Sequence, residues 1–204
     1  VDIRVIEEFR KQSIPVVLVN NYLDMDGLVC ISADHYGGAV QATEYLCKLG
    51  HCKIGLLSGR FSPQVSEARI EGFVKTLAKY DIPVDDRFIA DIEPALEDGE
   101  EIMTRMLRGV DRPTAFFCTN DTIAAGAMKA VTRAGLRVPE DIAIIGFDDS
   151  YISRVVEPEL TTVRIDAAKM GCLAMQTLFD LIAGMPVEKA HIQIPTELIV
   201  RGTA

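Results

Sequence analysis

The segment from Thr114 to Asp149 constrains the fold of this chain more than any other feature. Its two apolar, strand-like runs, TAFFC and IAIIGF, end abruptly in the polar pairs Asn120-Asp121 and Asp148-Asp149, and an amphipathic helical pattern separates them. This order predicts two parallel strands joined by a helical crossover. In an open parallel sheet, ligands bind beyond the carboxyl ends of the strands. The polar pairs therefore predict a crevice that holds a small polar molecule.

Strand-like and helix-like patterns alternate along most of the 204 residues. In the helix-like stretches, apolar residues recur every three or four positions, as at Ile70, Phe73 and Leu77. The expected strands cover residues 14–20, 28–32, 53–57, 88–92, 114–118, 142–147, 161–165, 191–194 and 198–201. The expected helices cover residues 5–12, 37–49, 66–80, 97–108, 122–134 and 167–183. The alternation predicts an α/β fold whose parallel sheets are covered by helices on both faces.

Composition indicates a globular protein, because 49% of the residues are apolar and 25% are charged. No apolar run reaches the roughly 18–20 residues that cross a bilayer. The first residues lead into an acidic amphipathic stretch, which differs from the basic and apolar regions of a secretory signal. We therefore expect a cytoplasmic protein without a membrane partner.

The net charge of −9 argues against direct contact with nucleic acid. A protein that binds a phosphate backbone presents a basic patch, whereas lysine and arginine never cluster beyond a pair in this sequence. Taken alone, the chain is not expected to bind DNA.

Motifs for metals, cofactors and nucleophilic catalysis are missing from the sequence. The five cysteines form no CxxC pair, and the three histidines have no ligand spacing. The patterns GxGxxG, GxxxxGK[ST] and GxSxG do not occur either. We therefore expect reduced thiols, no metal ion and no cofactor, and nothing here supports an enzyme.

Polar residues at the two strand ends have both a structural and a functional interpretation. Asp148 and Asp149 could cap the next turn, but an ionised carboxylate such as Asp148 also accepts several hydroxyl hydrogen bonds from a sugar or polyol. Asn120 could cap the following helix or bind ligand hydroxyls through its amide. Asp121 is the more plausible cap of that helix.

Arg69 and several aromatic residues complete the set of candidates. Arg69 is expected on the buried-face side of its helix, although most arginines lie at the surface. Its five donors would complement the acceptors of Asp148 and Asn120. Phe61 and Phe147 could offer ring faces to a sugar, whereas Phe117 is expected in the core.

From Ile14 onward, the chain resembles the lactose-repressor (LacI/GalR) family of bacterial transcription regulators. The matching blocks, in order, are IPVVLVN, LGH, SEARIEGF, RPTAFFCTNDTIAAGAM, GLRVPEDIAIIGFDD, PELTTVRID and IPTELIVRGT. Periplasmic sugar-binding proteins share the fold of this family, but LRVPEDIAIIGFDD followed by LTTVR is more typical of the repressors.

The resemblance implies a periplasmic-binding-protein-like fold of two parallel-sheet subdomains linked by crossing strands. Residues 1–50 and 164–187 would form an incomplete N-terminal subdomain, and residues 51–163 and 188–204 the C-terminal subdomain. Arg69, Asn120 and Asp148 fall on effector-binding positions of the family, where they would act as donor, two-way amide and hydroxyl acceptor.

The chain also departs from the family pattern. Asp34 is followed by His35 in place of asparagine, and Cys52 follows LGH where a basic residue is common. Positions near Pro63, Val65 and Pro94 that often carry polar ligand contacts are apolar here. The effector is therefore expected to be less polar than a free hexose, or to be held mainly by other parts of the site.

The function implied by the resemblance is that of the effector-binding and dimerisation core of a LacI-type regulator. Its expected partners are a sugar-like effector, a second copy of the chain, and operator DNA reached only through a helix-turn-helix headpiece outside this sequence. One alternative is a periplasmic sugar-binding protein for transport or chemotaxis, and another is an enzyme on a similar α/β scaffold.

Overall fold

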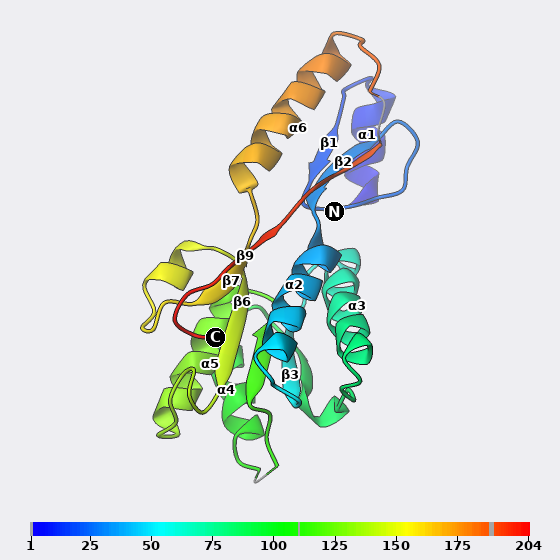
Figure 1. The fold of residues 1–204 in the computed structure, drawn as a ribbon. Helices are drawn as coiled ribbons and strands as arrows, with labels where there is room; N and C mark the ends of the chain where they lie inside the picture. Colours follow the sequence, from blue (N-terminus) through cyan, green and yellow to red (C-terminus); the bar gives the residue numbers. More distant parts are fainter. Residues whose placement is uncertain (1, 110, 188–189) are drawn as a thin grey trace. The chain divides into compact units, whose positions relative to one another are not determined.

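Helices and strands alternate along the chain (Figure 1). The computed structural model describes residues 2–109, 111–187 and 190–204. Its helices are α1 (Ile3–Lys11), α2 (His35–Lys48), α3 (Pro63–Lys79), α4 (Leu96–Met106), α5 (Asp121–Arg133) and α6 (Ala167–Ile182), with short 3-10 helices η1 (Asp86–Phe88) and η2 (Tyr151–Arg154). Its strands are β1 (Val17–Val19), β2 (Val29–Ala33), β3 (Ile54–Gly59), β4 (Ile89–Ile92), β5 (Ala115–Cys118), β6 (Ala143–Asp148), β7 (Thr161–Arg164), β8 (His191–Ile194) and β9 (Glu197–Ile199). The α/β fold class predicted from the alternation is confirmed.

The chain divides into two compact units, and the division differs from the expected one. The first unit comprises residues 1–34 and 166–195, and the second comprises residues 35–165 and 196–204. A boundary at residue 50 was expected, but α2 packs on the sheet of the second unit, where Ala39 and Leu46 are fully buried. Strand β8 pairs with β2, so the later boundary moves from residue 187 to residue 195.

A three-stranded parallel sheet in the order β1-β2-β8 forms the centre of the first unit. Its apolar cluster consists of Ile6, Leu18, Leu28 and Cys30. Helix α6 begins after Asp166, whose carboxylate accepts a hydrogen bond of 2.8 Å from the backbone N–H of Lys169 and caps the helix. Neither α6 nor any other helix of the described residues is long and apolar enough to cross a membrane.

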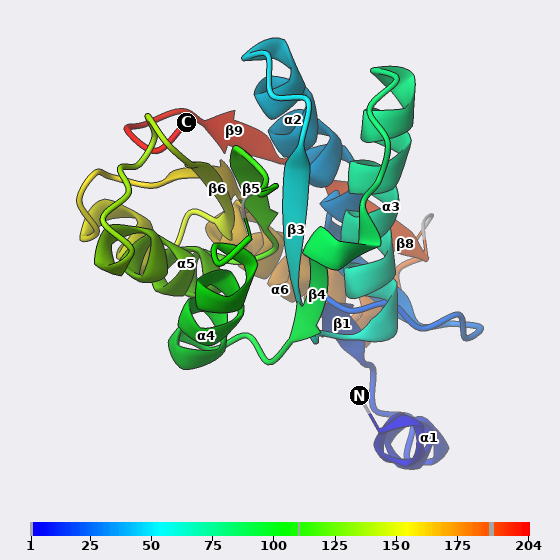
Figure 2. The same ribbon diagram turned by 90° about the horizontal axis from the view of Figure 1, so that it is seen from below.

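The second unit contains a six-stranded sheet in the order β4-β3-β5-β6-β7-β9. All neighbouring strands run parallel except β7 and β9, which pair antiparallel. Helices α2 and α3 cover one face and α4 and α5 cover the other (Figure 2). Successive strand residues point to opposite faces, so Leu56 packs with α2 and α3 whereas Leu57 packs with α4 and α5. The core of this unit is therefore two apolar layers separated by the sheet.

Two glycines set the close approach of α4 and α5. A Cβ atom added to Gly126 would collide with the carbonyl of Leu96, and one added to Gly99 would collide with the carbonyl of Ile123. Both obstacles are backbone atoms, which cannot move aside as a flexible side chain would. The close contact of these helices therefore requires glycine, which has no side chain, at positions 99 and 126.

The carboxyl ends of β3, β5 and β6 meet at one edge of the second unit's sheet. The N–H of Gly59, the last residue of β3, donates to Oγ1 of Thr119 just beyond β5 at 2.7 Å. The N–H of Thr119 in turn donates to the carbonyl of Leu57 at 2.9 Å. These bonds fix the residues that follow the strands and form the frame of the candidate site.

Candidate functional site

Arg69 and Asp148 meet at this edge of the sheet. Arg69 extends from α3 and is buried, with 2% of its surface exposed. Its Nη1 donates to the carbonyl of Thr119, and its Nη2 lies 3.4 Å from Oδ1 of Asp148 at the end of β6. Asn120 follows Thr119 in the chain and is also buried. The structure thus places the three residues predicted to bind a ligand at one edge of one unit.

The guanidinium of Arg69 lies against two phenylalanine rings. Its central carbon is 3.9 Å from the ring centre of Phe147 and 5.0 Å from that of Phe61, distances at which a cation is attracted to the ring face. Phe147 is fully buried and its ring supports Arg69, and the direct ligand contact expected for it stays a prediction. Phe61 is half-buried, and its contact with a ligand stays a prediction.

His35, the first residue of α2, is a further neighbour of Arg69. Its Nδ1 lies 3.2 Å from Nη2 of Arg69. Since a guanidinium only donates, Nδ1 accepts, and the neutral imidazole carries its proton on Nε2. Burial lowers the pKa of His35 to about 3, and the charge of Arg69 acts in the same direction. In the sequence, His35 is distinguished only because it replaces the asparagine of the family's Asp-Asn pattern. That difference does not predict a contact with Arg69.

Burial also shifts the ionisation of the Arg69–Asp148 pair. It lowers the pKa of Arg69 to about 10, although the charge of Asp148 opposes the shift. It raises the pKa of Asp148 to about 6, where Arg69 opposes the shift and the charge of Asp121 adds to it. Both groups are mainly charged at pH 7. Together with the neutral His35, they form a cluster without formal net charge.

Asn120, and not Asp121, caps α5. Oδ1 of Asn120 accepts a hydrogen bond of 2.8 Å from the N–H of Ile123, which is the N-cap arrangement. Asp121 was expected as the cap, but its buried carboxylate accepts from the hydroxyl of Thr162 and, at 2.6 Å, from the N–H of Ser150. The capping interpretation of Asn120 is therefore correct. A ligand role stays a prediction for its amide nitrogen, which carries two donors.

Three buried side-chain atoms near this edge have no hydrogen-bond partner among the described residues: Oγ of Ser58, Oγ of Ser62 and Nε of Arg69. Ser58 lies near the end of β3, and Ser62 directly precedes α3. Leaving a buried polar atom unpaired costs about 1–3 kcal/mol. This segment therefore offers groups that a bound polar molecule could satisfy. The sequence marks Ser58 as a polar strand end, but no pattern distinguishes Ser62.

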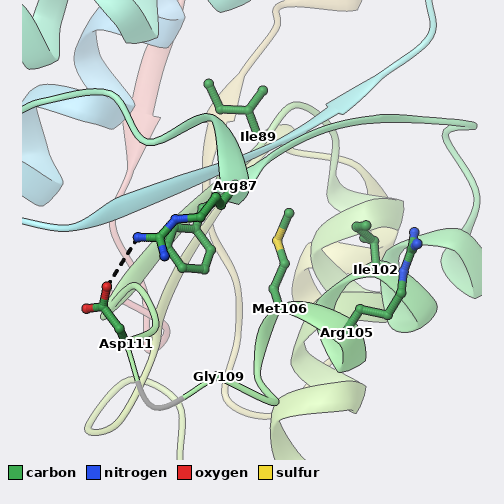
Figure 3. A pocket seen from close by; sticks show the side chains of 8 residues that line it. Arg87, Ile89, Ile102, Arg105, Met106, Gly109 and Asp111 are labelled. Carbon is green, nitrogen blue, oxygen red and sulfur yellow. Dashed lines mark hydrogen bonds and ion pairs between the residues drawn. The ribbon is translucent and has the colours of Figure 1, made fainter.

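A separate surface pocket lies at the opposite edge of the sheet (Figure 3). It is lined by Arg87, Phe88, Ile89, Ile102, Arg105, Met106, Gly109 and Asp111. These residues precede or begin β4, precede β5, or lie on and just beyond α4, so they flank the amino ends of the strands. Figure 3 shows Met106 between Arg87 and Ile102, with Arg87 donating to Asp111 at 3.2 Å. Arg69, Asn120 and Asp148, which were predicted to bind a ligand, are not among the described residues that line this pocket.

Thiol and metal chemistry add no second site to the part of the chain that the structure describes. All five cysteines are free; Cys30, Cys47 and Cys118 are buried, and Cys52 and Cys172 are exposed. No group of three or more histidine, cysteine, aspartate or glutamate side chains within residues 2–109, 111–187 and 190–204 is arranged to hold a metal ion.

The fold of parallel-sheet units defines a protein of the periplasmic-binding-protein-like class, and a family model described as a periplasmic binding protein-like domain matches residues 43–204. The probable HTH-type transcriptional repressor ExuR of Bacillus subtilis is 34% identical over 201 residues, which cover 98% of this chain and 60% of that protein. The HTH-type transcriptional repressor PurR of Pasteurella multocida is 36% identical over 191 residues, which cover 93% of this chain and 57% of that protein. The chain thus spans less than two thirds of the length of these curated relatives.

Solved structures narrow the class further. A regulatory protein of the LacI family from Chloroflexus aggregans matches with a TM-score of 0.90 at 31% identity, covering 97% of this chain and 71% of that one. A LacI family transcriptional regulator from Enterococcus faecium, solved with bound ribose, matches with a TM-score of 0.90 at 26% identity, covering 100% of this chain and 75% of that one. The chain therefore belongs to the LacI family, and the resemblance found in its motifs is confirmed.

Proposed function

We propose that this chain is the effector-binding core of a LacI-type transcription regulator, and that Arg69, Asn120 and Asp148 bind the effector. The observation that carries the proposal is the buried Arg69 beside Asp148 at the carboxyl edge of a parallel sheet. Small molecules bind at this edge in open α/β sheets. The unpaired Ser58, Ser62 and Arg69 atoms at the same edge support the assignment.

The hydrogen-bonding groups of this site suit a molecule with several hydroxyl groups. Thr119, His35 and Asp148 take up one Nη1 hydrogen and both Nη2 hydrogens of Arg69, which leaves its Nε hydrogen and one Nη1 hydrogen as donors. Asp148 accepts from hydroxyl groups, and the Asn120 amide nitrogen donates. Because the cluster has no formal net charge, an uncharged polyol suits it better than an anion, which needs surplus positive charge. The ribose-bound relative from Enterococcus faecium supports a sugar or sugar derivative.

The effector would control DNA binding through unequal affinity for two arrangements of the protein. The names of the ExuR and PurR relatives support a repressor and do not favour the periplasmic sugar-binding alternative. Because this chain is acidic, with a net charge of −9, we assign operator contact to a helix-turn-helix headpiece outside these residues. The same proposal includes a homodimer, which matches the two half-sites of an operator, and a location in the cytoplasm.

Binding without catalysis is part of this proposal. Near Arg69, the Nδ1 atom of His35 accepts from the guanidinium and so does not serve as a base for a nucleophile. A serine–histidine pair does occur in the first unit, where Oγ of Ser32 lies 2.8 Å from Nε2 of His191. Ser32 is buried there, which does not suit a nucleophile that a substrate must reach.

A thermal-shift screen tests the proposed function directly. The probes are D-ribose, D-glucose, cellobiose and adenosine, which are uncharged and rich in hydroxyl groups. A ligand at 100 times its Kd stabilises the folded state by about 2.7 kcal/mol, which raises the melting temperature by several degrees. We expect at least one probe to raise it, and the rise to disappear in Asp148→Asn and Arg69→Gln.

Asp141→Asn is the matched control, because Asp141 pairs with Arg137 elsewhere in the same unit. This variant should keep the full ligand-induced rise. A rise that survives in both Asp148→Asn and Arg69→Gln would place the binding site elsewhere. Chemical conversion of a probe by the protein, lost in Asp148→Asn, would favour the enzyme alternative.

A further inference from the structure

Two consecutive residues have positive φ: Asp148, the last residue of β6, at 110°, and Asp149, which follows it, at 50°. Residues other than glycine rarely adopt such values, and they persist only where the surrounding structure fixes the backbone. Asp148 is also the proposed acceptor for the effector. The conformation that places its carboxylate near Arg69 therefore needs a cause in the surrounding structure.

The carboxylate of Asp149 supplies the first restraint. Only 2% of this side chain is exposed. Its Oδ1 accepts from Nη2 of Arg201 at 2.5 Å, and its Oδ2 accepts from Nε of Arg164 at 2.8 Å. Arg154 at 3.3 Å and the hydroxyl of Ser153 at 3.1 Å complete the set. One buried anion is thus held by side chains from η2, β7 and the C-terminal segment.

The next residue along the chain supplies a second restraint. The N–H of Ser150 donates to Oδ2 of Asp121 at 2.6 Å, and the hydroxyl of Thr162 donates to Oδ1 of the same carboxylate. The N–H of Asp149 in turn lies 3.4 Å from that Thr162 hydroxyl. Hydrogen bonds therefore hold the backbone N–H groups of Asp149 and Ser150, the two residues that follow Asp148.

We propose that Asp149 is a positioning residue of the effector site: its carboxylate, held by Arg164 and Arg201, keeps the backbone of Asp148 at positive φ and so holds the Asp148 carboxylate beside Arg69. The inference deepens the proposed function, because the position of Asp148 matters for the effector only if Asp148 binds it. Asp149 itself faces its arginine partners and makes no ligand contact. If the role of Asp149 were purely structural, its carboxylate would bind Arg201, but the conformation of Asp148 would not depend on it.

Substitution Asp149→Asn in the 204-residue chain distinguishes these roles. It keeps the shape of the side chain and removes the charge that attracts Arg164 and Arg201. Two nuclear magnetic resonance readouts report on Asp148: its backbone HN–Hα coupling, which depends on φ, and the pH titration of its carboxyl carbon. We expect the coupling to change toward that of extended backbone. We also expect the titration midpoint to fall by about half a pH unit or more, because the released carboxyl becomes more hydrated.

Two further variants keep the test decisive. Arg154→Gln removes the longest and most exposed of the three arginine contacts and should leave both readouts unchanged. Arg164→Gln removes the 2.8 Å contact while leaving Arg201 in place, and it serves as the test if Asp149→Asn does not fold. Its expected result is the same change at Asp148.

The inference is overturned if Asp149→Asn or Arg164→Gln lowers the melting temperature while the coupling and titration of Asp148 match those of the parent chain. Neither readout requires an effector. A failure of every probe in the thermal-shift screen would therefore count against the proposed function and leave the positioning role of Asp149 standing.

Discussion

The guanidinium carbon of Arg69 lies 3.9 Å from the ring centre of Phe147, and Nη2 of the same group lies 3.4 Å from Oδ1 of Asp148, the next residue in the chain. Neighbouring residues of a strand normally point to opposite faces. Both reach the same arginine here because the φ of 110° at Asp148 interrupts that alternation. One strand end therefore provides both the apolar support and the acceptor for a buried cation.

Removal of the Phe147 ring should destabilise the second unit. The ring is fully buried between Arg69 and the apolar layer that contains Phe117, with their ring centres 6.3 Å apart. We expect Phe147→Ala to reduce the free energy of unfolding by about 3–5 kcal/mol, as measured by urea denaturation. Tyr151→Ala, at a residue that is 83% exposed in the same unit, should change it by less than about 0.5 kcal/mol. Equal effects of the two substitutions would contradict this packing.

Removal of the Arg69 charge should raise the pKa of Asp148 further. Burial raises this pKa to about 6 against the opposing charge and hydrogen bond of Arg69. In Arg69→Gln, burial and Asp121 would act without that opposition, so the carboxyl should titrate above pH 6. Carbon-13 resonance of the Asp148 carboxyl measures the shift. A lower titration midpoint in the variant would show that Arg69 does not stabilise the charged carboxylate.

His35 and Asp148 should give opposing pH dependences to stability. The pKa of His35 is lowered from 6.5 to about 3, so the unfolded chain takes up this proton first and stability falls as the pH decreases from 6.5 toward 3. The pKa of Asp148 is raised from 3.8 to about 6, so the folded chain takes up this proton first and stability rises as the pH decreases from 6 toward 3.8.

The two dependences can be separated by calorimetry between pH 4 and pH 7. His35→Gln should lose the first dependence, so its melting temperature should rise on acidification relative to that of the parent chain. Asp148→Asn should lose the second and become more acid-sensitive than the parent. If the melting temperatures of all three proteins changed with pH in parallel, neither His35 nor Asp148 would have the shifted pKa given above.

A methyl group at Gly126 should disrupt the packing of α4 and α5. The added Cβ would meet the backbone carbonyl of Leu96, and overpacking of this kind costs about 1–3 kcal/mol. Gly171 on α6 is the matched control because a Cβ there meets no atom within 4 Å. Gly171→Ala should stabilise its helix by about 0.5–1 kcal/mol. Denaturant midpoints of the two variants should therefore move in opposite directions.

The strand ends and the burial of Arg69 could be predicted from sequence because both depend on local patterns. Apolar runs stop where polar residues begin, and Arg69 shares a helical face with Phe73. The role of His35 could not be predicted, since it depends on an arginine 34 positions away. The partners of Asp149, Arg164 and Arg201, are likewise distant in the sequence, and no pattern there distinguishes them from surface arginines.

The sequence pattern also could not predict the sheet on which α2 packs. An apolar stripe predicts that a helix packs on a sheet, but it does not say which of two sheets receives it. Gly72 of α3 allows the two helices to approach closely, since a Cβ added to it would meet Ala39 and the carbonyl of Tyr36 on α2. This helix pairing assigns α2 to the second unit and moves the boundary to residue 34.

Both units depend on the last residues of the chain. Strand β8 completes the sheet of the first unit, and β9 and Thr203 complete the second, where Oγ1 of Thr203 donates to the carbonyl of Ile144 at 2.6 Å and accepts from the N–H of Thr161 at 2.9 Å. Domains that follow one another along a chain can fold in turn during synthesis, N-terminal first. These two units are interleaved, so neither can finish folding until residues 190–204 have left the ribosome.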